Sequence, residues 1–518
     1  MTEYKEIAIS EFFEKNKHLL GFDNPTKALL TMIKEAVDNS LDACEEQGEL
    51  PEINISIQNP EGSTFKISVE DNGPGIPRQY TAKVLAKFLY GSKFKSLGEA
   101  GMQSRGQQGI GISACILYAQ LTTGKPVHID SKTKEEKMYS CDLMLETSKN
   151  EPVITNEKYL ETKKLSGLKI TLEMKGVYRR VKGVEDFLKY TSIANPHAKI
   201  TFIDPEGNKV LFDRGVDKLP VRPKPVKAHP HGIELGTLIK MLARTNSRTV
   251  FSFLINDFSR VGTQSAKEIF EESNLEAQMR PNAVTRDQAE KLLNAMQKVK
   301  LQRPPTDCLS PIGEAELIKG LKKEYKAAEF ITASSRPVAV YRAIPFQVEV
   351  GLAYGKEMFS EGEKTEESEK QAETAELIRF TNKVPLFYQQ SECAIFKAVV
   401  KTPWKRYGVP QSNGSLPTAP LVIVVHVASV WVPFISEGKQ AIASYPDIIK
   451  EIRLAVGEVG RKLQRHISAE HRKYAHERRM KVFEKYGDEV ASAISNLTGR
   501  KKPEVAEVIN REIQKRRE

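Results

Sequence analysis

Apolar side chains recur first at helical spacing and then at strand spacing in the opening part of the chain. An amphipathic helix is predicted over residues 25–47, because one apolar stripe runs along it at Leu29, Leu30, Ile33, Val37 and Leu41. Two strands are predicted next, since apolar and polar side chains alternate over 53–57 and 65–69. Helices are also expected over 78–98 and 110–118, on either side of a loop rich in Gly, Ser and Gln.

The pattern changes near residue 219, where a stretch rich in Pro and Lys predicts a semi-rigid linker. The segment after it has helical periodicity with short turns, and we expect helices over 235–242, 266–272 and 286–299. Strands are expected beyond residue 308, among them 338–341, 346–350 and the Val-rich run 421–435. A long charged helix is predicted over 446–486.

Length and composition fit a protein of several domains. At about 150 residues per domain, 518 residues make about three, and a 40% hydrophobic content excludes disorder for most of the chain. The five cysteines are spread singly, which excludes a disulfide framework or a zinc ribbon. The longest apolar run, 421–435, is shorter than the ~20 residues of a membrane span, so we expect a soluble cytoplasmic protein that contacts no membrane.

Positive charge is concentrated in two regions. The formal charge is +11; residues 218–300 hold 14 Lys and Arg against 8 Asp and Glu, and residues 451–518 hold 17 against 11. Two basic regions on a nearly neutral body favour contact with a polyanion such as nucleic acid. Ordinary solvated helix faces remain the alternative for both regions.

Three short motifs within about 80 residues carry the candidate chemistry. Glu35, Asn39 and Asp42 fall on one face of the first predicted helix, where a carboxylate and an amide can orient a water and ligate Mg²⁺. Asp71, Gly73 and Gly75 follow a strand, and glycines there let a flat ligand approach the backbone. Residues 105–111 form a Gly-rich loop before a helix, which suits phosphate but is neither a Walker A loop nor a dinucleotide fingerprint.

Together these motifs resemble the N, G1 and G2 boxes of the Bergerat-fold (GHKL) ATPase superfamily. The matching residues are 35–43, 71–77 and 106–111. The resemblance implies ATP and Mg²⁺ as cofactors, with Glu35 as the general base, Asn39 as the Mg²⁺ ligand and Asp71 as the reader of the adenine amino group.

The resemblance also implies a lid that closes over the phosphates. Its residues would be Arg105, Gly106, Gln107, Gln108, Gly109, Ile110 and Gly111, followed by Ile112 and Ser113 at the start of the helix, with Ser92 and Lys93 nearby. Residues 166–171, which include Thr171, fit the box that closes the adenine pocket.

Within the superfamily, nearly the whole chain resembles the ATP-binding B subunits of type IIB topoisomerases (topoisomerase VI). Only about 30 residues precede Glu35, which excludes the histidine-kinase order, and the chain has no Asp-x-Asp pair of a gyrase-type cleavage domain. The resemblance implies an α+β multidomain fold in four parts. These are a Bergerat-fold α/β sandwich ATPase domain (1–217), a helix-two-turn-helix domain (218–305), a transducer with a sheet and a long helix (306–486), and a basic tail (487–518). In the transducer, Lys439 would reach the γ-phosphate.

The implied function is an ATP-driven clamp that passes one DNA duplex through a transient double-strand break made by a partner A subunit, relaxing supercoils and decatenating DNA. ATP would dimerise the N-terminal domains, with Met1–Leu20 exchanged as a strap, in an A2B2 heterotetramer docked through the long helix. Double-stranded DNA contacts are expected at two basic segments, for which ordinary surface loops are the alternative: Lys175, Arg179, Arg180, Trp404, Lys405 and Arg406. A GHKL clamp acting as a chaperone or mismatch-repair scaffold without strand passage is the alternative function.

Overall fold

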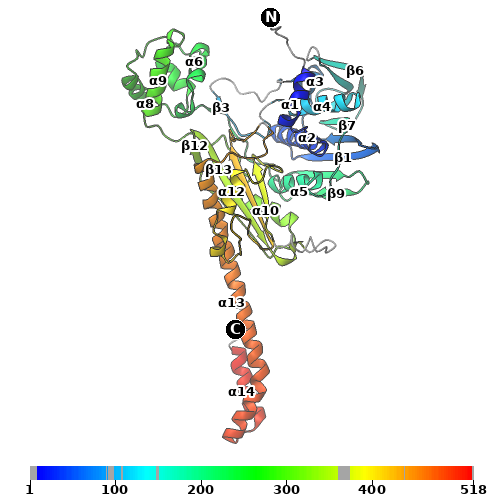
Figure 1. Cartoon of the computed structure of the whole chain (residues 1–518), viewed down its shortest axis with the longest axis vertical. Coiled ribbons are helices and arrows are strands. Elements are labelled where there is room, and N and C mark those ends of the chain that lie inside the picture. The colour runs from blue at the N-terminus through cyan, green and yellow to red at the C-terminus, as the bar shows by residue number, and fades with distance from the viewer. Residues whose placement is uncertain are drawn as a thin grey trace.

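The computed structural model describes residues 9–88, 90, 99–106, 109–147, 151–359, 374–436 and 438–515. Figure 1 shows an N-terminal α/β body, a separate helical body, a central sheet layered with helices, and a helical stalk that ends in a hairpin. None of the helices in the described part of the chain combines the length and the apolarity that a membrane span needs. Ser92, Lys93, Gln107 and Gln108 lie outside the described residues.

The N-terminal body has one mixed sheet with helices packed on one face. The strands run in the order β6-β5-β4-β7-β2-β1-β8-β9, with β1 parallel to β8. Their bounds are β1 Glu52–Glu61, β2 Thr64–Glu70, β4 Val127–Lys132, β5 Met138–Glu146, β6 Glu151–Leu160, β7 Gly167–Lys175, β8 Lys199–Ile203 and β9 Lys209–Phe212. The helices are α1 Ile9–Leu20, α2 Pro25–Gln47, α3 Arg78–Ala86, α4 Gly111–Thr123 and α5 Val184–Ala194. The two strands predicted over 53–57 and 65–69 are confirmed as β1 and β2.

The predicted helix over 25–47 is confirmed as α2, and its ends are chemically defined. Asn24 caps the first turn by accepting from the Thr26 N–H at 2.8 Å, and Gly48 closes the last turn at φ +85°. The helix predicted over 78–98 is shorter, since Lys87 is extended and ends α3 at Ala86. Residues 99–101 form a short strand, β3 (Glu99–Gly101), where a loop was expected. In α1, Phe13 packs on Phe22 of the same chain with ring centroids 5.5 Å apart.

The helical body follows the Pro/Lys linker and has its own core. It contains α6 Leu235–Arg244, α7 Val250–Asp257, α8 Thr263–Ser273 and α9 Arg286–Lys298, preceded by the short strand β10 (Val226–Lys227). The periodicity predicted α6, α8 and α9 but missed α7. That helix starts in a capping box, in which Thr249 and Ser252 each bind the other's backbone N–H.

The central body is a sheet with helices on both faces. Its strands follow the order β11-β13-β16-β14-β15, and β12 pairs with β13. The strands are β11 Phe330–Ser335, β12 Ala339–Tyr341, β13 Ile344–Tyr354, β14 Glu376–Thr381, β15 Val384–Pro385 and β16 Leu421–Ser429. Helix α10 (Glu314–Glu324) packs on one face with α5, while α12 (Ala394–Val400) and α13 (Pro446–Thr498) cover the other. Every residue of β16 is buried between these layers, which confirms residues 421–429 of the Val-rich run as a buried strand. The rest of the predicted run, 430–435, lies beyond the strand, and Trp431 and Ile435 in it are exposed.

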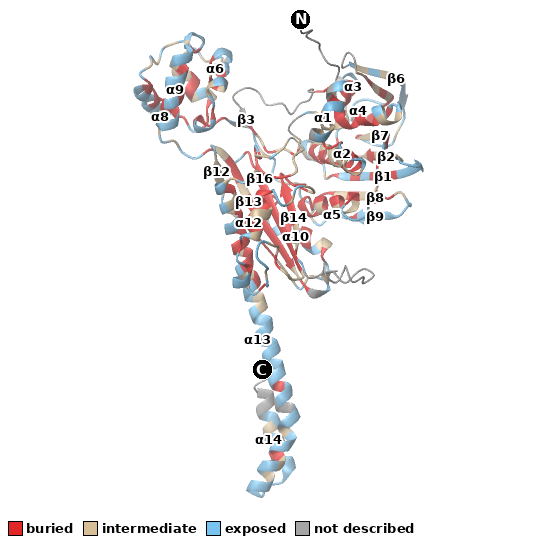
Figure 2. Cartoon of the chain, viewed as in Figure 1, coloured by how far each residue is buried: buried red, intermediate tan, exposed pale blue. Residues whose placement is uncertain are grey.

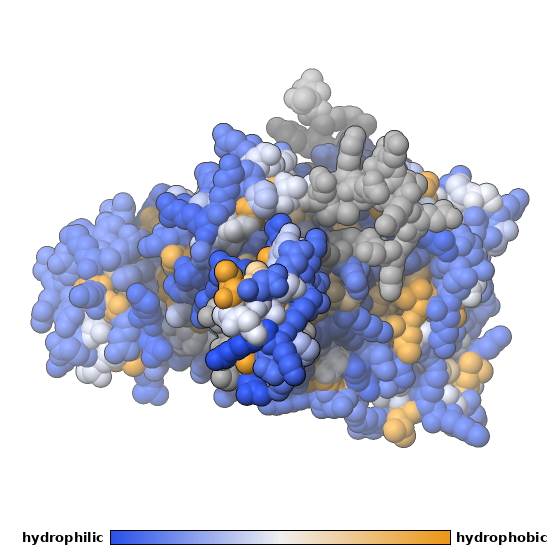
Figure 3. All heavy atoms as spheres, turned by 90° about the horizontal axis from the view of Figure 1, so that it is seen from below, coloured by the Kyte–Doolittle hydropathy of each residue, from blue (hydrophilic) through white to orange (hydrophobic). Residues whose placement is uncertain are grey.

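The stalk is longer than the predicted helix over 446–486. Helix α13 continues to Thr498, 53 residues in all, and Gly499 ends it at φ +69°. The expected tail then forms α14 (Lys502–Lys515), which folds back along α13 (Figure 1). The stalk is largely exposed below the sheet (Figure 2), and its end, seen from below, carries hydrophilic side chains with a few apolar ones among them (Figure 3).

Candidate active site

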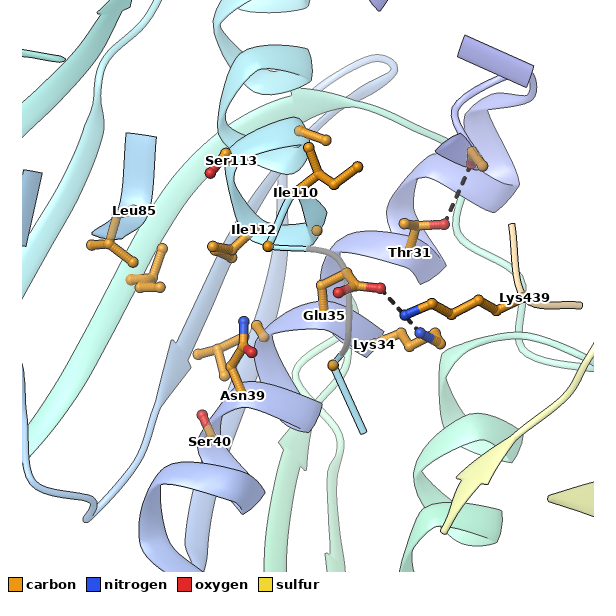
Figure 4. A pocket seen from close by; sticks show the side chains of 18 of the residues that line it. Thr31, Lys34, Glu35, Asn39, Ser40, Leu85, Ile110, Ile112, Ser113 and Lys439 are labelled. Carbon is orange, nitrogen blue, oxygen red and sulfur yellow. Dashed lines mark hydrogen bonds and ion pairs between the residues drawn. The ribbon is translucent and has the colours of Figure 1, made fainter. Parts of the chain in front are cut away.

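A pocket of about 340 Å³ lies where the N-terminal body meets the central body. Its walls come from α2, the turn at 71–76, the start of α4 and two segments of the central body, 385–388 and 438–440. The pocket therefore brings together side chains that lie far apart in the sequence. Figure 4 shows its interior.

Glu35 lies midway along α2 with its carboxylate turned into the pocket (Figure 4). The Lys34 Nζ is 3.0 Å from Glu35 Oε1 and 3.4 Å from Asp38 Oδ2. Burial disfavours the charged amine, but the two carboxylates outweigh it and raise the pKa of Lys34. At Gly111, an added Cβ would overlap the Glu35 carboxylate, so the end of the Gly-rich loop can approach this group only as glycine.

Asn39 lies one turn beyond Glu35 and also faces the pocket. A Cβ built on Gly106 would be 4.0 Å from Asn39 Oδ1, so the start of the same loop lies over the amide. Asp42, the third residue of the predicted face, does not line this pocket. It forms an ion pair with Arg105, Oδ1 to Nη1 at 2.6 Å, on the far side of the loop.

Asp71 is fixed at the base of the pocket by three donors. It accepts hydrogen bonds from Ser40 Oγ at 2.8 Å, from the Gly73 N–H at 2.9 Å and from the Leu168 N–H at 3.2 Å. Burial raises the pKa of the Asp71 carboxyl, and these three hydrogen bonds oppose the rise. The outcome is an oriented acceptor in a wall to which Val69, Leu168 and Ile170 contribute apolar side chains. Gly75, at φ +69°, passes so close to the Lys132 carbonyl that a Cβ would overlap it.

Most of the described lid residues line the pocket, and three predicted binding residues do not. Gly106, Gly109, Ile110, Gly111, Ile112 and Ser113 are in the wall. Gly73 lies outside the wall, and its N–H donates to Asp71. The Thr171 hydroxyl donates to Ser68 on the neighbouring strand, and it is Leu168 and Ile170 of the same segment that line the wall. Arg105 points away from the pocket, because acidic side chains beyond the loop bind its guanidinium.

The central body closes the pocket with two segments. Pro385, Leu386, Phe387 and Tyr388 line it, and no local motif marks these residues in the sequence. Lys34 was also missed, although its position next to Glu35 was a usable signal. Lys439 lines the pocket together with Gly438 and Gln440, and Figure 4 shows its side chain extended toward Glu35. The backbone of Lys439 is left-handed at φ +51°, and its N–H donates to the Ser436 carbonyl at 3.1 Å.

The predicted DNA contacts differ in how exposed they are. Trp404 is fully buried, and its Nε1–H donates to the Val399 carbonyl at 2.9 Å, so its ring is core and is closed to DNA. Lys405 and Arg406 beside it are exposed. Lys175 and Arg179 are exposed too, but Arg180 is paired with Glu206 at 2.7 Å and with Asp204 at 3.3 Å.

A helix that carries Glu35 and Asn39, a buried Asp after a strand and a Gly-rich loop at a helix start define a GHKL-type ATPase. Comparison with known families agrees: residues 28–170 match the family of histidine kinase-, DNA gyrase B- and HSP90-like ATPases. Residues 304–479 match the transducer of the topoisomerase VI B subunit.

Curated relatives place the chain within one family. The B subunit of type 2 DNA topoisomerase 6 from Archaeoglobus fulgidus is 49% identical over 91% of this chain and 76% of its own length. The counterpart from Methanosarcina acetivorans is 44% identical over 98% and 79%, and that from Thermococcus kodakarensis 37% identical over 99% and 95%. The chain belongs to the family of type 2 DNA topoisomerase 6 B subunits. The resemblance found in the sequence is confirmed, and the chain is an ATPase subunit of a type IIB DNA topoisomerase.

Proposed function

We propose that this chain is an ATP-operated clamp whose pocket hydrolyses ATP only when the central body completes it. The observation that carries the proposal is the wall formed by residues 438–440, which brings Lys439 of the transducer into the same pocket as Glu35 of α2. Through this contact, the state of the nucleotide can set the position of the transducer.

In the proposed reaction, a water attacks the γ-phosphorus of ATP and ADP leaves. The Glu35 carboxylate accepts the proton of that water, and the Lys34 amine 3.0 Å away orients the carboxylate. The Lys439 ammonium stabilises the negative charge that develops on the γ-phosphoryl oxygens. The N-terminus of α4 and the Gly-rich loop direct backbone N–H groups at the phosphates.

Asn39 fits a Mg²⁺ site in which the nucleotide supplies most ligands. Its amide oxygen faces the pocket beside Gly106, and no cluster of three His, Cys, Asp or Glu suited to a metal occurs among the described residues. Proteins commonly hold Mg²⁺ through one or two side chains plus substrate phosphates. A bound Mg²⁺ would neutralise phosphate charge. The fixed carboxylate of Asp71 fits the exocyclic amine of adenine, because an oriented acceptor in an apolar wall selects a donor there.

Movement of the transducer would reach a cleavage partner through the stalk. Helix α13 begins at Pro446, shortly after the 438–440 segment in the sequence, packs on the sheet and extends beyond it as one continuous helix (Figure 1). We infer that the stalk docks on the A subunit, that ATP binding dimerises two copies in an A2B2 assembly, and that α6–α9 form the helix-two-turn-helix domain of residues 218–305.

Double-stranded DNA is proposed to contact the cations around η4 (Trp404–Tyr407). A groove of about 990 Å³ beside η4 is lined by Lys401, Lys450, Arg453 and Arg461, which are all exposed. The aromatic residues of this segment are structural: Trp404 is buried, and Tyr407 packs on α13 at Gly460. The cations therefore offer charge to phosphates without any reading of bases.

DNA affinity is expected to fall steeply as the salt concentration rises. Binding of Lys and Arg releases counterions from the phosphates, and the free energy gained by this release is smaller at high salt. Replacing Lys405 and Arg406 together by Ala should lower affinity at every sequence and reduce the slope of log affinity against log salt by about 2, roughly one per phosphate contact. Anisotropy with a labelled duplex at several salt concentrations measures this. Lys322→Ala, an exposed lysine on α10, is the control. If the double variant keeps the wild-type slope, η4 does not contact the DNA.

The function as a whole is tested by relaxation of supercoiled plasmid with and without a candidate A subunit. We expect relaxation only when the A subunit and ATP are both present, because no cleavage motif was found in this chain. Relaxation by this chain alone would contradict the proposal. If the assembled pair relaxes nothing while ATP still dimerises the chain, the chaperone or repair-scaffold clamp becomes the better interpretation.

A further inference from the structure

Arg105 precedes the Gly-rich loop but takes no part in the pocket wall. Its side chain is 4% exposed and binds three side chains on the opposite side. Nη1 donates to Asp42 Oδ1 at 2.6 Å and to Glu45 Oε2 at 3.0 Å, while Nη2 donates to Glu45 Oε1 at 2.6 Å and to Asn195 Oδ1 at 2.5 Å. Such a two-pronged contact fixes the direction of the guanidinium as well as its position.

The partners of Arg105 continue the line of functional residues along α2. Glu35, Asn39 and Asp42 are spaced so that they follow one face of the helix. The loop follows the same line: Gly111 meets the Glu35 carboxylate, Gly106 lies over Asn39, and Arg105 is tied to Asp42. The described residues of the loop therefore lie along the Glu35–Asp42 stretch of α2, with Arg105 as the fixed end.

The residues before Arg105 are held as well, by segments from the rest of the chain. Strand β3 pairs with β10, with Gly101 opposite Val226. Gln103 binds Ser310 twice, donating to its carbonyl at 3.0 Å and accepting from its N–H at 2.7 Å. The Ser104 carbonyl accepts from Asn382 at 3.2 Å. Of these contacts, those of Arg105 alone reach the helix that carries Glu35 and Asn39.

We propose that Arg105 is a positioning residue for nucleotide binding, which fixes Gly106, the start of the Gly-rich loop, on α2 so that Gly106 and residues 109–111 can lie over the phosphates. Arg105 itself does not touch the nucleotide. The inference rests on the proposed function of the pocket as an ATP site. It replaces the sequence-based expectation that Arg105 binds the cofactor directly.

Arg105→Lys separates positioning from charge. Lysine keeps the positive charge, but one ammonium cannot span Asp42, Glu45 and Asn195 as the planar fork does. The start of the loop should loosen while the base of the pocket around Asp71 stays intact. We expect the dissociation constant of AMPPNP, a non-hydrolysable ATP analogue, to rise about tenfold, ~1.4 kcal/mol. That of AMP should stay within about twofold, and KM for ATP should rise more than kcat falls.

The measurement is titration calorimetry of the full chain with AMPPNP and with AMP, alongside steady-state ATPase kinetics and thermal unfolding. Arg214→Lys is the matched control, since Arg214 forms an ion pair with Glu52 at 2.9 Å away from the pocket. Asp42→Asn removes one charge from the same cluster with little change of shape, and we expect a smaller rise for AMPPNP in the same direction. If Arg105→Lys does not fold, Asp42→Asn alone tests the proposal.

Equal losses for AMPPNP and AMP in both variants would mean that the cluster only supports the fold, and would overturn the proposal. So would AMPPNP affinities that match the Arg214→Lys control. The proposed function is tested separately by Glu35→Gln, which should bind AMPPNP but not turn over. The Arg105 inference can therefore fail while the ATPase assignment stands, and a failure of wild-type AMPPNP binding would remove both.

Discussion

Glu35→Gln is expected to lower kcat for ATP hydrolysis by about 10²–10⁴ while leaving AMPPNP affinity within about twofold. Glutamine fills the same space beside Lys34 and Gly111 and still accepts a hydrogen bond, so the pocket should keep its shape. It cannot take a proton from the attacking water at neutral pH. The loss should therefore fall on turnover rather than on binding.

Steady-state kinetics with purified protein, combined with calorimetric AMPPNP binding, measure both quantities. Glu49→Gln, an exposed carboxylate just beyond the end of α2, is the control and should behave as wild type. A Glu35→Gln protein that hydrolyses ATP at the wild-type rate would refute the assignment of the base. Loss of binding together with turnover would assign Glu35 to the nucleotide site but not to proton transfer.

Lys439→Ala should lower kcat by about 10²–10³, the usual effect of removing one preorganised charge or donor from a developing negative charge. Gly438, Lys439 and Gln440 lie in the pocket wall, and the side chain of Lys439 extends toward Glu35 (Figure 4). Adenine binding should persist, because Asp71 and its three donors belong to the N-terminal body. Plasmid relaxation by the complex with an A subunit should be lost.

The measurement pairs ATPase kinetics with AMP and AMPPNP affinities for Lys439→Ala, and Lys322→Ala on α10 is the control from the same body. Affinity for AMPPNP should fall while affinity for AMP does not, since AMP lacks the γ-phosphate that the ammonium would reach. If turnover and relaxation both stay at the wild-type level, the loop at 438–440 is a wall of the pocket and not a sensor of the nucleotide.

Local features of the sequence predicted the N-terminal elements that form the pocket. Helix α2 and strands β1 and β2 follow from short-range periodicity, and Asn24 and Gly48 set the ends of α2 by contacts within one turn. The first box lies on α2, the second follows β2 and the third precedes α4. Their order within a short stretch of the chain was enough to recognise the three together. The same residues indicated the family, and comparison over nearly the whole chain confirmed it.

The predicted binding roles of Arg105 and Trp404 were wrong, because the direction in which each side chain points depends on distant parts of the chain. Arg105 could point into the pocket or away from it, and the acidic pair Asp42 and Glu45 turned it away. Trp404 stands among exposed cations in the sequence, yet it is buried beneath α13 because its ring fills the core there. Neither outcome is visible locally, since the deciding partners lie tens of residues away.

The ATPase class, the family and most of the residues that line the pocket from α2, the 71–75 turn and the Gly-rich loop follow from the order of amino acids. Three-dimensional packing was needed to show that residues 385–388 and 438–440 complete the pocket and that Arg105 ties the loop to α2. It was also needed to show that the stalk runs to Thr498 and folds back. The two kinds of feature differ in range, because periodicity and capping act within a few residues, whereas closure of the pocket depends on how two separately folded bodies pack.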